Sequence, residues 1–269
     1  MISIIIPTYN SADTLERCIK SILNQNYSNF EILIIDGLST DLTSTIAQSF
    51  TDDRLRFFAE KDKGIYDAMN KGIAKAVGEY LLFLGSDDSL FDTNVLINVV
   101  KKIGKRVDGI FYGNVKMNGK SSWIKDGSIY GGAFDLKRLF NFNIPHQAIL
   151  YHKSIFNKLG LFNINYPLLA DHDFILRAAA SNDLIYIDEL IANFSLGGAS
   201  GKATDKQFEK DKLKNIITYF RKKIHSSAFV DLRFFVQQAA FKHSTGISLG
   251  TRIYCILVYA KLKAQSLFS

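Results

Sequence analysis

Two adjacent carboxylates, Asp87 and Asp88, follow an apolar run at residues 80–84 (YLLFL) in the segment LGSDDSL. A short apolar run of this kind is typical of a buried strand, so the two negative charges lie where the chain leaves the core. They either end the strand in a solvated loop or hold a positively charged group. The seven residues alone favour the loop, and the rest of the sequence has to decide between the two interpretations.

Polar residues follow three further apolar runs. The sets are residues 8–10 (TYN) after the run 2–6, residues 36–37 (DG) after the run 30–35, and residues 60–63 (EKDK) after the run 55–59. In open α/β sheets, ligands bind beyond the carboxyl ends of the strands. Four polar strand ends along one rim therefore predict a binding site.

Helical patterns separate these runs. Apolar residues recur at helical spacing in residues 15–22 and 65–76, and a short helix is expected at residues 43–50. This alternation predicts an α/β fold with a mostly parallel sheet and helices on both faces.

After residue 90 the alternation is looser. Helices are expected at residues 93–102, 153–159 and 171–180, and strands at 148–152, 184–187 and 191–196. From Lys202 the pattern is helical to the end. We therefore divide the chain into a body, residues 1–201, with halves at 1–90 and 91–201, and a helical C-terminal extension, residues 202–269.

The composition points to a cytoplasmic protein. The chain has 269 residues, of which 47% are hydrophobic and 22% charged, and this fits one large domain or two small ones. Cys18 and Cys255 have neither a metal-binding spacing nor a disulfide framework, which fits a reducing compartment. The apolar run at the N-terminus is too short for a signal peptide, and no run approaches the ~20 apolar residues that span a bilayer.

Positive charge is concentrated in the C-terminal extension. Residues 202–269 hold 13 Lys and Arg against 4 Asp and Glu, a net charge of +9, whereas residues 1–201 have a net charge of −2. Such asymmetry indicates an acidic partner. We expect no nucleic-acid binding, because no stacking or groove-reading motif is present. The extension is either a basic amphipathic segment at the inner face of the cell membrane or a helical cap that packs on the body.

Five blocks in residues 1–200 point to a family. In order they are SIIIPTYN, IIDGLSTDLT, EKDKGIYDAMNKGIAKAVGEYLLFLGSDD, PHQAILYHK and LADHDFILR. The ordered set resembles the family 2 glycosyltransferases, inverting enzymes with the GT-A (Rossmann-like) fold that build bacterial surface polysaccharides. The resemblance implies a nucleotide-sugar donor (a UDP-sugar is favoured), a divalent metal and a glycan or lipid-linked acceptor. It assigns the half 1–90 to the donor and the half 91–201 to the acceptor.

The resemblance gives the opening carboxylates a role. A nucleoside diphosphate is a poor leaving group until its charge is neutralised, and Mn²⁺ or Mg²⁺ does this with one or two carboxylates and the phosphate oxygens. By similarity, Asp88 ligates the metal, and Asp87 contacts the ribose or the metal's water. With this context, the pair is expected to be a metal site.

Further donor-binding residues follow from the same resemblance. Asp36 is similar to the family's base-contacting acid, although an Asp in a turn before glycine is also common. The family often has a second acid at the next position, and Gly37 stands there instead, which leaves the base more open. The other nucleotide-sugar candidates are Pro7, Thr8, Tyr9, Lys63 and Asp67, and for Lys63 a solvated side chain is the alternative.

Asp171 is the expected general base. LADHDFILR is similar to the family motif that places an acid at the start of a helix, where it takes the proton of the acceptor hydroxyl. Burial would raise its pKa, and stabilisation of the helix dipole is its structural alternative. Asp173 is spaced to pair with Arg177 at i+4. Acceptor or supporting roles, each with a structural alternative, are expected for His146, Gln147, Asp173 and Trp123.

Two rival functions use similar residues. A sugar nucleotidyltransferase also binds a nucleotide and a metal through paired acids, but its phosphate-binding loop is glycine-rich, and PTYNSADT after the first strand has no glycine. A catalytically silent nucleotide-sugar-binding subunit would have no need of Asp36, Asp88 and Asp171 together. The sequence therefore favours a glycosyltransferase, and the family resemblance implies transfer of a hexosyl or N-acetylhexosaminyl group without identifying the sugar.

Overall fold

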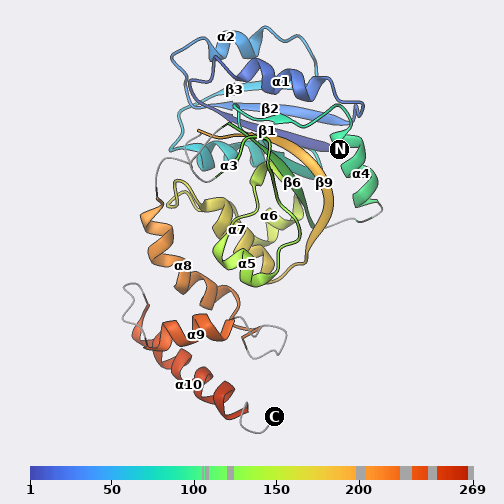
Figure 1. The fold of residues 1–269 in the computed structure, drawn as a ribbon. Coiled ribbons are helices and arrows are strands. Elements are labelled where there is room, and N and C mark those ends of the chain that lie inside the picture. The colour runs from blue at the N-terminus through green and yellow to red at the C-terminus, as the bar shows by residue number, and fades with distance from the viewer. Residues whose placement is uncertain are drawn as a thin grey trace.

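The computed structural model describes residues 1–104, 106, 109–119, 124–197, 204–224, 232–241 and 247–265. Within these residues, a nine-stranded sheet has the order β3-β2-β1-β4-β8-β6-β9-β5, with β7 paired to β6 (Figure 1). The first four strands pair in parallel, as the alternation predicts. They are β1 (Ile2–Thr8), β2 (Phe30–Asp36), β3 (Leu55–Ala59) and β4 (Tyr80–Phe83).

The second half of the sheet is mixed. Strand β8 lies antiparallel between β4 and β6, while β9 runs parallel to β6. The two strands expected at 184–187 and 191–196 are one strand, β9, which continues through Asp188 at a left-handed φ of 43°. Asp tolerates this conformation, and the register with β6 shifts beside it. The strands are β5 (Ser89–Leu90), β6 (Ile110–Asn118), β7 (Ile129–Tyr130), β8 (Ile149–His152) and β9 (Leu184–Ser195).

Helices cover both faces of the sheet, because alternate strand residues point to opposite sides. Ile4 and Ile6 of β1 pack with α1 (Leu15–Leu23), α2 (Thr43–Gln48) and α4 (Val95–Ile103). Ile5 packs in the opposite cluster, with α3 and the later helices. These are α3 (Ile65–Lys75), α5 (Leu136–Asn141), α6 (Ser154–Leu159) and α7 (Ala170–Ala179), and a 3₁₀ turn, η1 (His146–Ala148), precedes β8.

Helix α3 packs unusually close to β1. A Cβ at Gly72 would lie 2.4 Å from Cγ2 of Ile5, so only glycine allows this approach. The close packing fixes the first turn of α3, which carries Tyr66, at the rim of the sheet where the predicted site lies.

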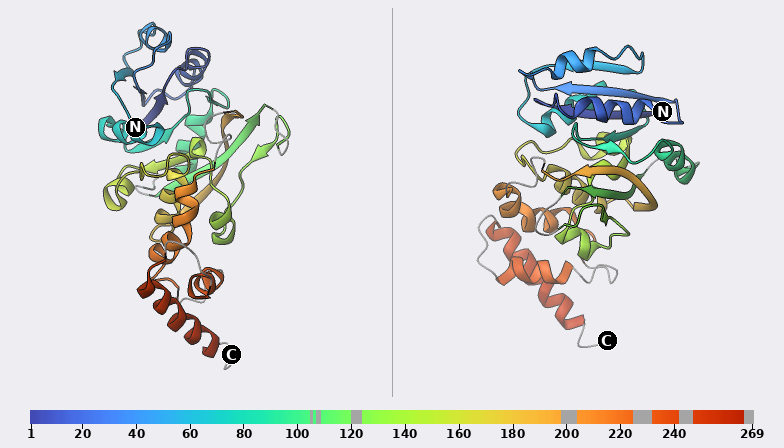
Figure 2. Two further views of the ribbon diagram at one scale, coloured as in Figure 1. Left: turned by 90° about the vertical axis from the view of Figure 1, so that its left-hand side faces the viewer. Right: turned by 45° about the horizontal axis from the view of Figure 1, so that its top comes forward.

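The C-terminal helices are α8 (Lys206–Tyr219), α9 (Leu232–Phe241) and α10 (Leu249–Gln265). Phe208 of α8 is fully buried, and α9 reaches the body through a ring contact between Phe235 and Phe140. Helix α10 packs on α9 and lies at the end of the molecule remote from β1–β3 (Figures 1 and 2). In the described ranges, no helix combines the length and apolar character that crossing a bilayer requires. The division at residues 201 and 202 stays a prediction.

Asp205 joins the start of α8 to the body. Its Oδ1 accepts a hydrogen bond from the backbone N–H of Phe208 at 3.0 Å and caps the helix. Its Oδ2 accepts from the N–H groups of Leu168 and Leu169 at 2.9 and 3.1 Å. Asp205 thereby holds the segment that leads directly into α7.

Candidate active site

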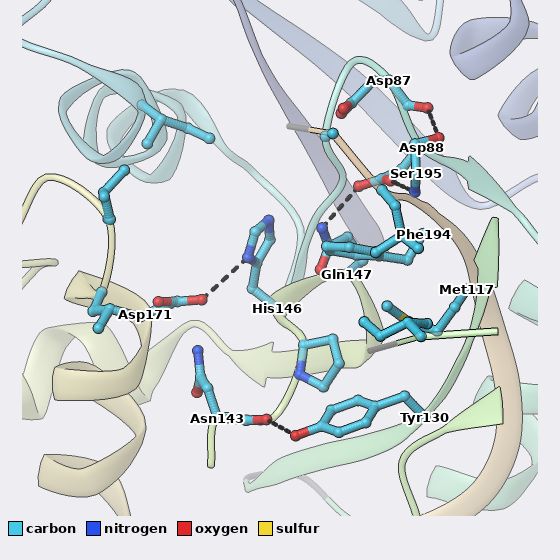
Figure 3. Close-up of a pocket in the computed structure, with 18 of the residues that line it drawn as sticks. Asp87, Asp88, Met117, Tyr130, Asn143, His146, Gln147, Asp171, Phe194 and Ser195 are labelled. Carbon is cyan, nitrogen blue, oxygen red and sulfur yellow. Dashed lines mark hydrogen bonds and ion pairs between the residues drawn. The ribbon is translucent and has the colours of Figure 1, made fainter. Parts of the chain in front are cut away.

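A cavity of about 390 Å³ lies at the carboxyl end of β4 (Figure 3). One wall carries Asp87 and Asp88, in the loop after that strand. The facing wall carries Asp171, at the start of α7, and His146, in the turn before β8. The structure thus brings together the predicted metal-binding pair, the predicted general base and the predicted acceptor-side histidine. Asp171 lies 25 positions from His146 in the chain and 84 from Asp87.

Asp88 is buried and held by two hydrogen bonds. Its Oδ1 accepts from the backbone N–H of Ser195 at 2.7 Å, and its Oδ2 accepts from Nε2 of Gln147 at 2.8 Å. Burial, followed by the negative charge of Asp87, raises the pKa of Asp88 to about 6, and the two hydrogen bonds only partly oppose this. The carboxylate is therefore fixed in position, and neither the hydrogen bonds nor the charge of His146 offsets its burial beside a second acid.

The carboxylates of Asp87 and Asp88 converge above Gly85. A Cβ at Gly85 would lie 2.8 Å from Oδ1 of Asp87 and 2.6 Å from Oδ2 of Asp88. Glycine at this position is therefore what allows two like charges to approach the same point. Arg17 and the Ser195 hydroxyl hold the loop by donating hydrogen bonds to the backbone oxygen of Asp87, not to its carboxylate.

This arrangement fits a divalent cation bound together with a phosphate. In the described part of the chain, no group of three or more His, Cys, Asp or Glu side chains forms a complete metal cage. Mg²⁺ and Mn²⁺ sites of nucleotide enzymes need only one or two carboxylates, with the substrate phosphates and water as the other ligands. A cation at Asp87 and Asp88 would also remove the repulsion that raises the pKa of Asp88.

Asp171 is buried like Asp88, but hydrogen-bond donors surround its carboxylate. Nδ1 of His146 lies 3.2 Å from its Oδ2. The Tyr66 hydroxyl lies 2.8 Å from its Oδ1 and has the carbonyl oxygen of Leu168, at 2.9 Å, as an alternative acceptor. The backbone N–H of His172 also donates to Oδ1, at 2.8 Å. The carboxylate is thus oriented by three elements: α3, η1 and α7 itself.

These donors reverse the pKa shift that burial alone would cause. Burial is the largest influence and raises the pKa of Asp171, but the hydrogen bond and charge of His146, with the Tyr66 hydrogen bond, outweigh it and lower the pKa. The expectation that burial would raise the pKa of Asp171 was wrong, because it omitted these partners. Asp171 is therefore ionised at neutral pH and able to accept a proton.

His146 extends the Asp171 wall toward the cavity. Its Nδ1 faces Asp171, and its Nε2 is buried without a hydrogen-bond partner in the structure. Figure 3 shows the ring between Asp171 and Gln147. A carboxylate on one ring nitrogen and an unpartnered second nitrogen is the arrangement of an oriented acid–base pair.

The predicted base-binding residues meet at the ends of β1 and β2. Thr8 pairs with Asp36 in the sheet register, and the Gly37 N–H donates to the Thr8 oxygen at 2.9 Å. Asp36 is fully buried and accepts hydrogen bonds from the backbone N–H and hydroxyl of Ser39. Pro7 is buried beside them, and the Tyr9 ring is exposed. The structure brings these four predicted residues together, but none of them lines the cavity that holds Asp87 and Asp88.

Lys63 and Asp67 do not line the described cavity. Lys63 is exposed, and its backbone N–H donates to Oδ2 of Asp67 at 3.0 Å. Asp67 also lies 3.7 Å from Nζ of Lys71. Its contacts therefore stabilise the start of α3, and a nucleotide role for either residue stays a prediction.

Asp173 points away from the cavity, toward α8. Its Oδ1 accepts hydrogen bonds from Asn215 and Tyr219 at 3.0 and 2.8 Å. The expected contact with Arg177 is present at 3.8 Å. Asp173 therefore joins α7 to α8, while Trp123 lies outside the described residues.

The remaining cavity wall is apolar. Among the described residues that line it, no Lys or Arg is present, and the acidic groups are the three aspartates above. The Tyr130 hydroxyl donates to the Asn143 backbone oxygen at 2.9 Å. The apolar surface comes mainly from Met117, Ile124, Pro145, Phe194 and Leu196.

Sequence reasoning missed Tyr66, Gly85 and Ser195. Tyr66 lies within the pattern of α3 and meets Asp171 across 105 positions, so no local signal marks it. Ser195 approaches Asp88 only because β9 ends beside the β4 loop. Gly85 could have been noticed, since a glycine directly before paired acids permits close approach.

Comparisons with known proteins agree with this geometry. The family described as "Glycosyl transferase family 2" matches residues 3–166. The chain is 42% identical over 219 residues to a "PGL/p-HBAD biosynthesis glycosyltransferase" of Mycobacterium bovis, covering 78% of this chain and 83% of the relative. The chain belongs to glycosyltransferase family 2.

Solved structures show the same fold. Staphylococcus aureus TarS (residues 1–349), crystallised with UDP-GlcNAc, superposes with a TM-score of 0.67 at 18% identity, covering 94% of this chain and 79% of TarS. The mannosyltransferase PcManGT of Pyrobaculum calidifontis, in complex with GDP-Man and Mn²⁺, gives a TM-score of 0.59 at 16% identity, covering 100% and 75%. At these identities the likeness establishes the GT-A fold of this family 2 glycosyltransferase.

Proposed function

We propose that this glycosyltransferase is an inverting, metal-dependent enzyme that transfers a sugar from a nucleotide-sugar, with a UDP-sugar favoured, to a hydroxyl of a glycan or lipid-linked acceptor. The observation that carries the proposal is the opposition of Asp88 and Asp171 across one cavity, with pKa values shifted in opposite directions. Paired titratable groups with divergent pKa values are typical of sites that divide two chemical roles.

On the donor wall, Asp87 and Asp88 would hold the cation, and Gln147 and Ser195 keep Asp88 in place. When bound, Mn²⁺ or Mg²⁺ neutralises the charge that develops on the leaving diphosphate. Thr8, Tyr9 and Asp36 lie where the nucleoside would bind at the sheet rim. The complex of PcManGT with Mn²⁺ and those of TarS with UDP and UDP-GlcNAc support a cation and a uridine nucleotide.

On the acceptor wall, Asp171 takes the proton from the acceptor hydroxyl as its oxygen attacks the anomeric carbon. The C–O bond to the leaving diphosphate breaks on the opposite face of the sugar, so the configuration inverts. His146 and Tyr66 hold the carboxylate for this step. A positioned base of this kind contributes roughly 100-fold to 10,000-fold to a rate.

The wall beyond Asp171 favours an uncharged acceptor with an apolar face. An anionic acceptor would meet three aspartates and no basic side chain among the described lining residues. Phe194 and Met117 offer apolar contact instead.

A donor panel tests the proposal. UDP-, GDP- and dTDP-sugars are titrated into the protein calorimetrically with and without Mn²⁺, and turnover with a neutral aryl glycoside and a matched anionic acceptor is followed by NMR of the anomeric proton. We expect Mn²⁺-dependent binding of one nucleotide class and an inverted product from the neutral acceptor. Retention of configuration would contradict the assigned base, whereas donor binding without turnover on any acceptor would favour the silent binding subunit.

A further inference from the structure

Helix α10 is apolar on two opposite faces. One face packs against the rest of the protein through Cys255, Val258 and Leu262, which are all buried. The other face is exposed and carries Leu249, at 73% exposure, together with Ile253, Ile256 and Leu257. An exposed row of large aliphatic side chains is unfavourable in water, so a second apolar face needs a covering partner.

The exposed residues form a continuous stripe. At 100° per residue, positions 249, 253, 256 and 257 fall within one quadrant or so of the helix, and Ala260 and Ala264, also exposed, fall between them. Basic residues border the stripe on both sides. They are Arg252 and Lys263 on one side and Lys261 on the other.

Helix α9 adds aromatic surface beside this stripe. Phe234 and Phe241 are seven positions apart, on one face of α9, and both are more than half exposed. Phe241 packs edge-to-face on Tyr259 of α10, with ring centroids 5.2 Å apart. Tyr259 lies next to Arg252 around α10, so the exposed aromatic side chains of α9 flank the basic border of the stripe.

We propose that α9 and α10 form a docking surface for an anionic lipid bilayer, with the stripe of α10 lying in the plane of the interface. A helix with an apolar face, basic borders and too little apolar length to span is the kind that lies in a membrane surface. The net charge of +9 of residues 202–269 adds attraction to anionic head groups. The proposal goes beyond the proposed function and does not rest on it.

The charge pattern favours a bilayer over a second copy of the chain. Neither α9 nor α10 contains an Asp or Glu. A symmetric pair of α10 helices would bring the basic borders of both copies together without an acidic partner on these helices. Anionic lipid head groups supply the opposite charge, and lysine side chains can extend from the apolar stripe to reach them.

The position of α10 is compatible with this orientation. Figures 1 and 2 place α10 at one end of the molecule and β1–β3 at the other. A protein docked through α10 would keep its predicted nucleotide-binding rim in the aqueous phase, while its second half stands nearer the lipid.

Vesicle flotation of the full chain tests the proposal. The protein is mixed with phosphatidylcholine vesicles containing 0% or about 40% phosphatidylglycerol at about 100 mM salt. We expect binding to the anionic vesicles only. Leu257→Glu should weaken binding at least about tenfold, because a charge replaces apolar surface in the interface. Val77→Glu is the matched control, since Val77 on the body and Leu257 are both 66% exposed, and it should bind as wild type.

A second variant separates charge from folding defects. Lys261→Gln keeps a polar side chain but removes its charge, and it should weaken binding about fivefold by loss of one interfacial charge. Circular dichroism melting of all variants checks the fold. Failure of the wild-type chain to float with anionic vesicles overturns the proposal, as does wild-type affinity in a folded Leu257→Glu protein. A dimer by light scattering that Leu257→Glu dissociates, without vesicle binding, would assign the stripe to a second copy of the chain.

Discussion

The two walls of the cavity bury chemically identical carboxylates and give them opposite properties. Asp88 is 1% exposed and Asp171 is 5% exposed, so burial disfavours the charge of both. Asp88 has a second acid beside it and its pKa is raised, whereas Asp171 has His146 and Tyr66 beside it and its pKa is lowered. Burial alone therefore predicts nothing about a catalytic carboxylate; the neighbouring charges and donors decide its role.

The largest expected effect is at the donor wall. Asp88→Ala should abolish Mn²⁺-dependent donor binding and reduce turnover by about 10,000-fold, because the leaving diphosphate loses its neutralising cation. Calorimetry with the donor and Mn²⁺ measures binding directly. The exposed Asp53 provides the control variant Asp53→Ala. Equal donor affinity in Asp88→Ala and in this control would show that Asp88 does not bind the metal.

A large effect of a different kind is expected at the acceptor wall. Asp171→Asn should lower kcat on the order of 1,000-fold while donor and Mn²⁺ affinities stay within about twofold of wild type, because the amide cannot accept the proton. Steady-state kinetics and calorimetry together give this separation, and the exposed Asp183 supplies Asp183→Asn as a control. A wild-type kcat in Asp171→Asn would eliminate Asp171 as the base. His146→Gln in the same assays shows whether the proton passes through the ring.

A smaller effect is expected for Gln147, which orients Asp88 but is not itself a proposed metal ligand. Gln147→Ala should weaken Mn²⁺ affinity about 10-fold to 100-fold without changing the Asp171 wall, because Asp88 loses the Nε2 donor at 2.8 Å that orients it. Manganese titrations followed by electron paramagnetic resonance measure this. Gln48 on α2 is exposed, and Gln48→Ala should leave the affinity unchanged. If both variants behave alike, Gln147 does not support the metal.

The last effect concerns the dependence of stability on pH and not binding or turnover. Because the pKa of Asp88 is raised from 3.8 to about 6 in the folded protein, the folded state holds a proton that the unfolded state has released between these values. Metal-free wild type should therefore lose on the order of 3 kcal/mol relative to Asp88→Asn as the pH rises from about 4 to about 7. Urea unfolding across this range measures the difference, which should disappear with saturating Mn²⁺ and donor.

The parallel half of the fold could be predicted because its signals are local. Each strand from β1 to β4 is a short apolar run that ends in polar residues, and a helical pattern separates it from the next. In the second half the strand at 148–152 and the helices at 153–159 and 171–180 were predicted, but the strand pairing could not be, because β8 and β6 are joined by antiparallel pairing between distant segments. The continuity of β9 depends on Asp188 in a left-handed conformation, and its sequence does not specify that.

The candidate site shows the same limit. The motifs around Asp87, Asp88 and Asp171 were enough to name these residues through their resemblance to a known family, although the residues around Asp87 and Asp88 alone favoured a loop. Gln147 was expected only in an acceptor or supporting role, and Tyr66 was not expected at all. Their contacts with these aspartates were not predictable, because they reach them across 59 and 105 positions. The sign of the Asp171 pKa shift depends on those partners, and that is why the sequence-based expectation failed there.

The carboxylate of Asp205 has a consequence for how this chain can be divided. It caps α8 and also holds the backbone of Leu168 and Leu169, immediately before the helix that carries Asp171. A shortened protein that ended before residue 204 would lose the support of the segment that leads to Asp171, although every side chain of the proposed site would still be present. Exchange of C-terminal segments between related enzymes should therefore leave α8 with the body and begin after it. The first C-terminal helix is therefore part of the same structural module as the body. The sequences of the later helices can differ between relatives without disturbing the segment before α7.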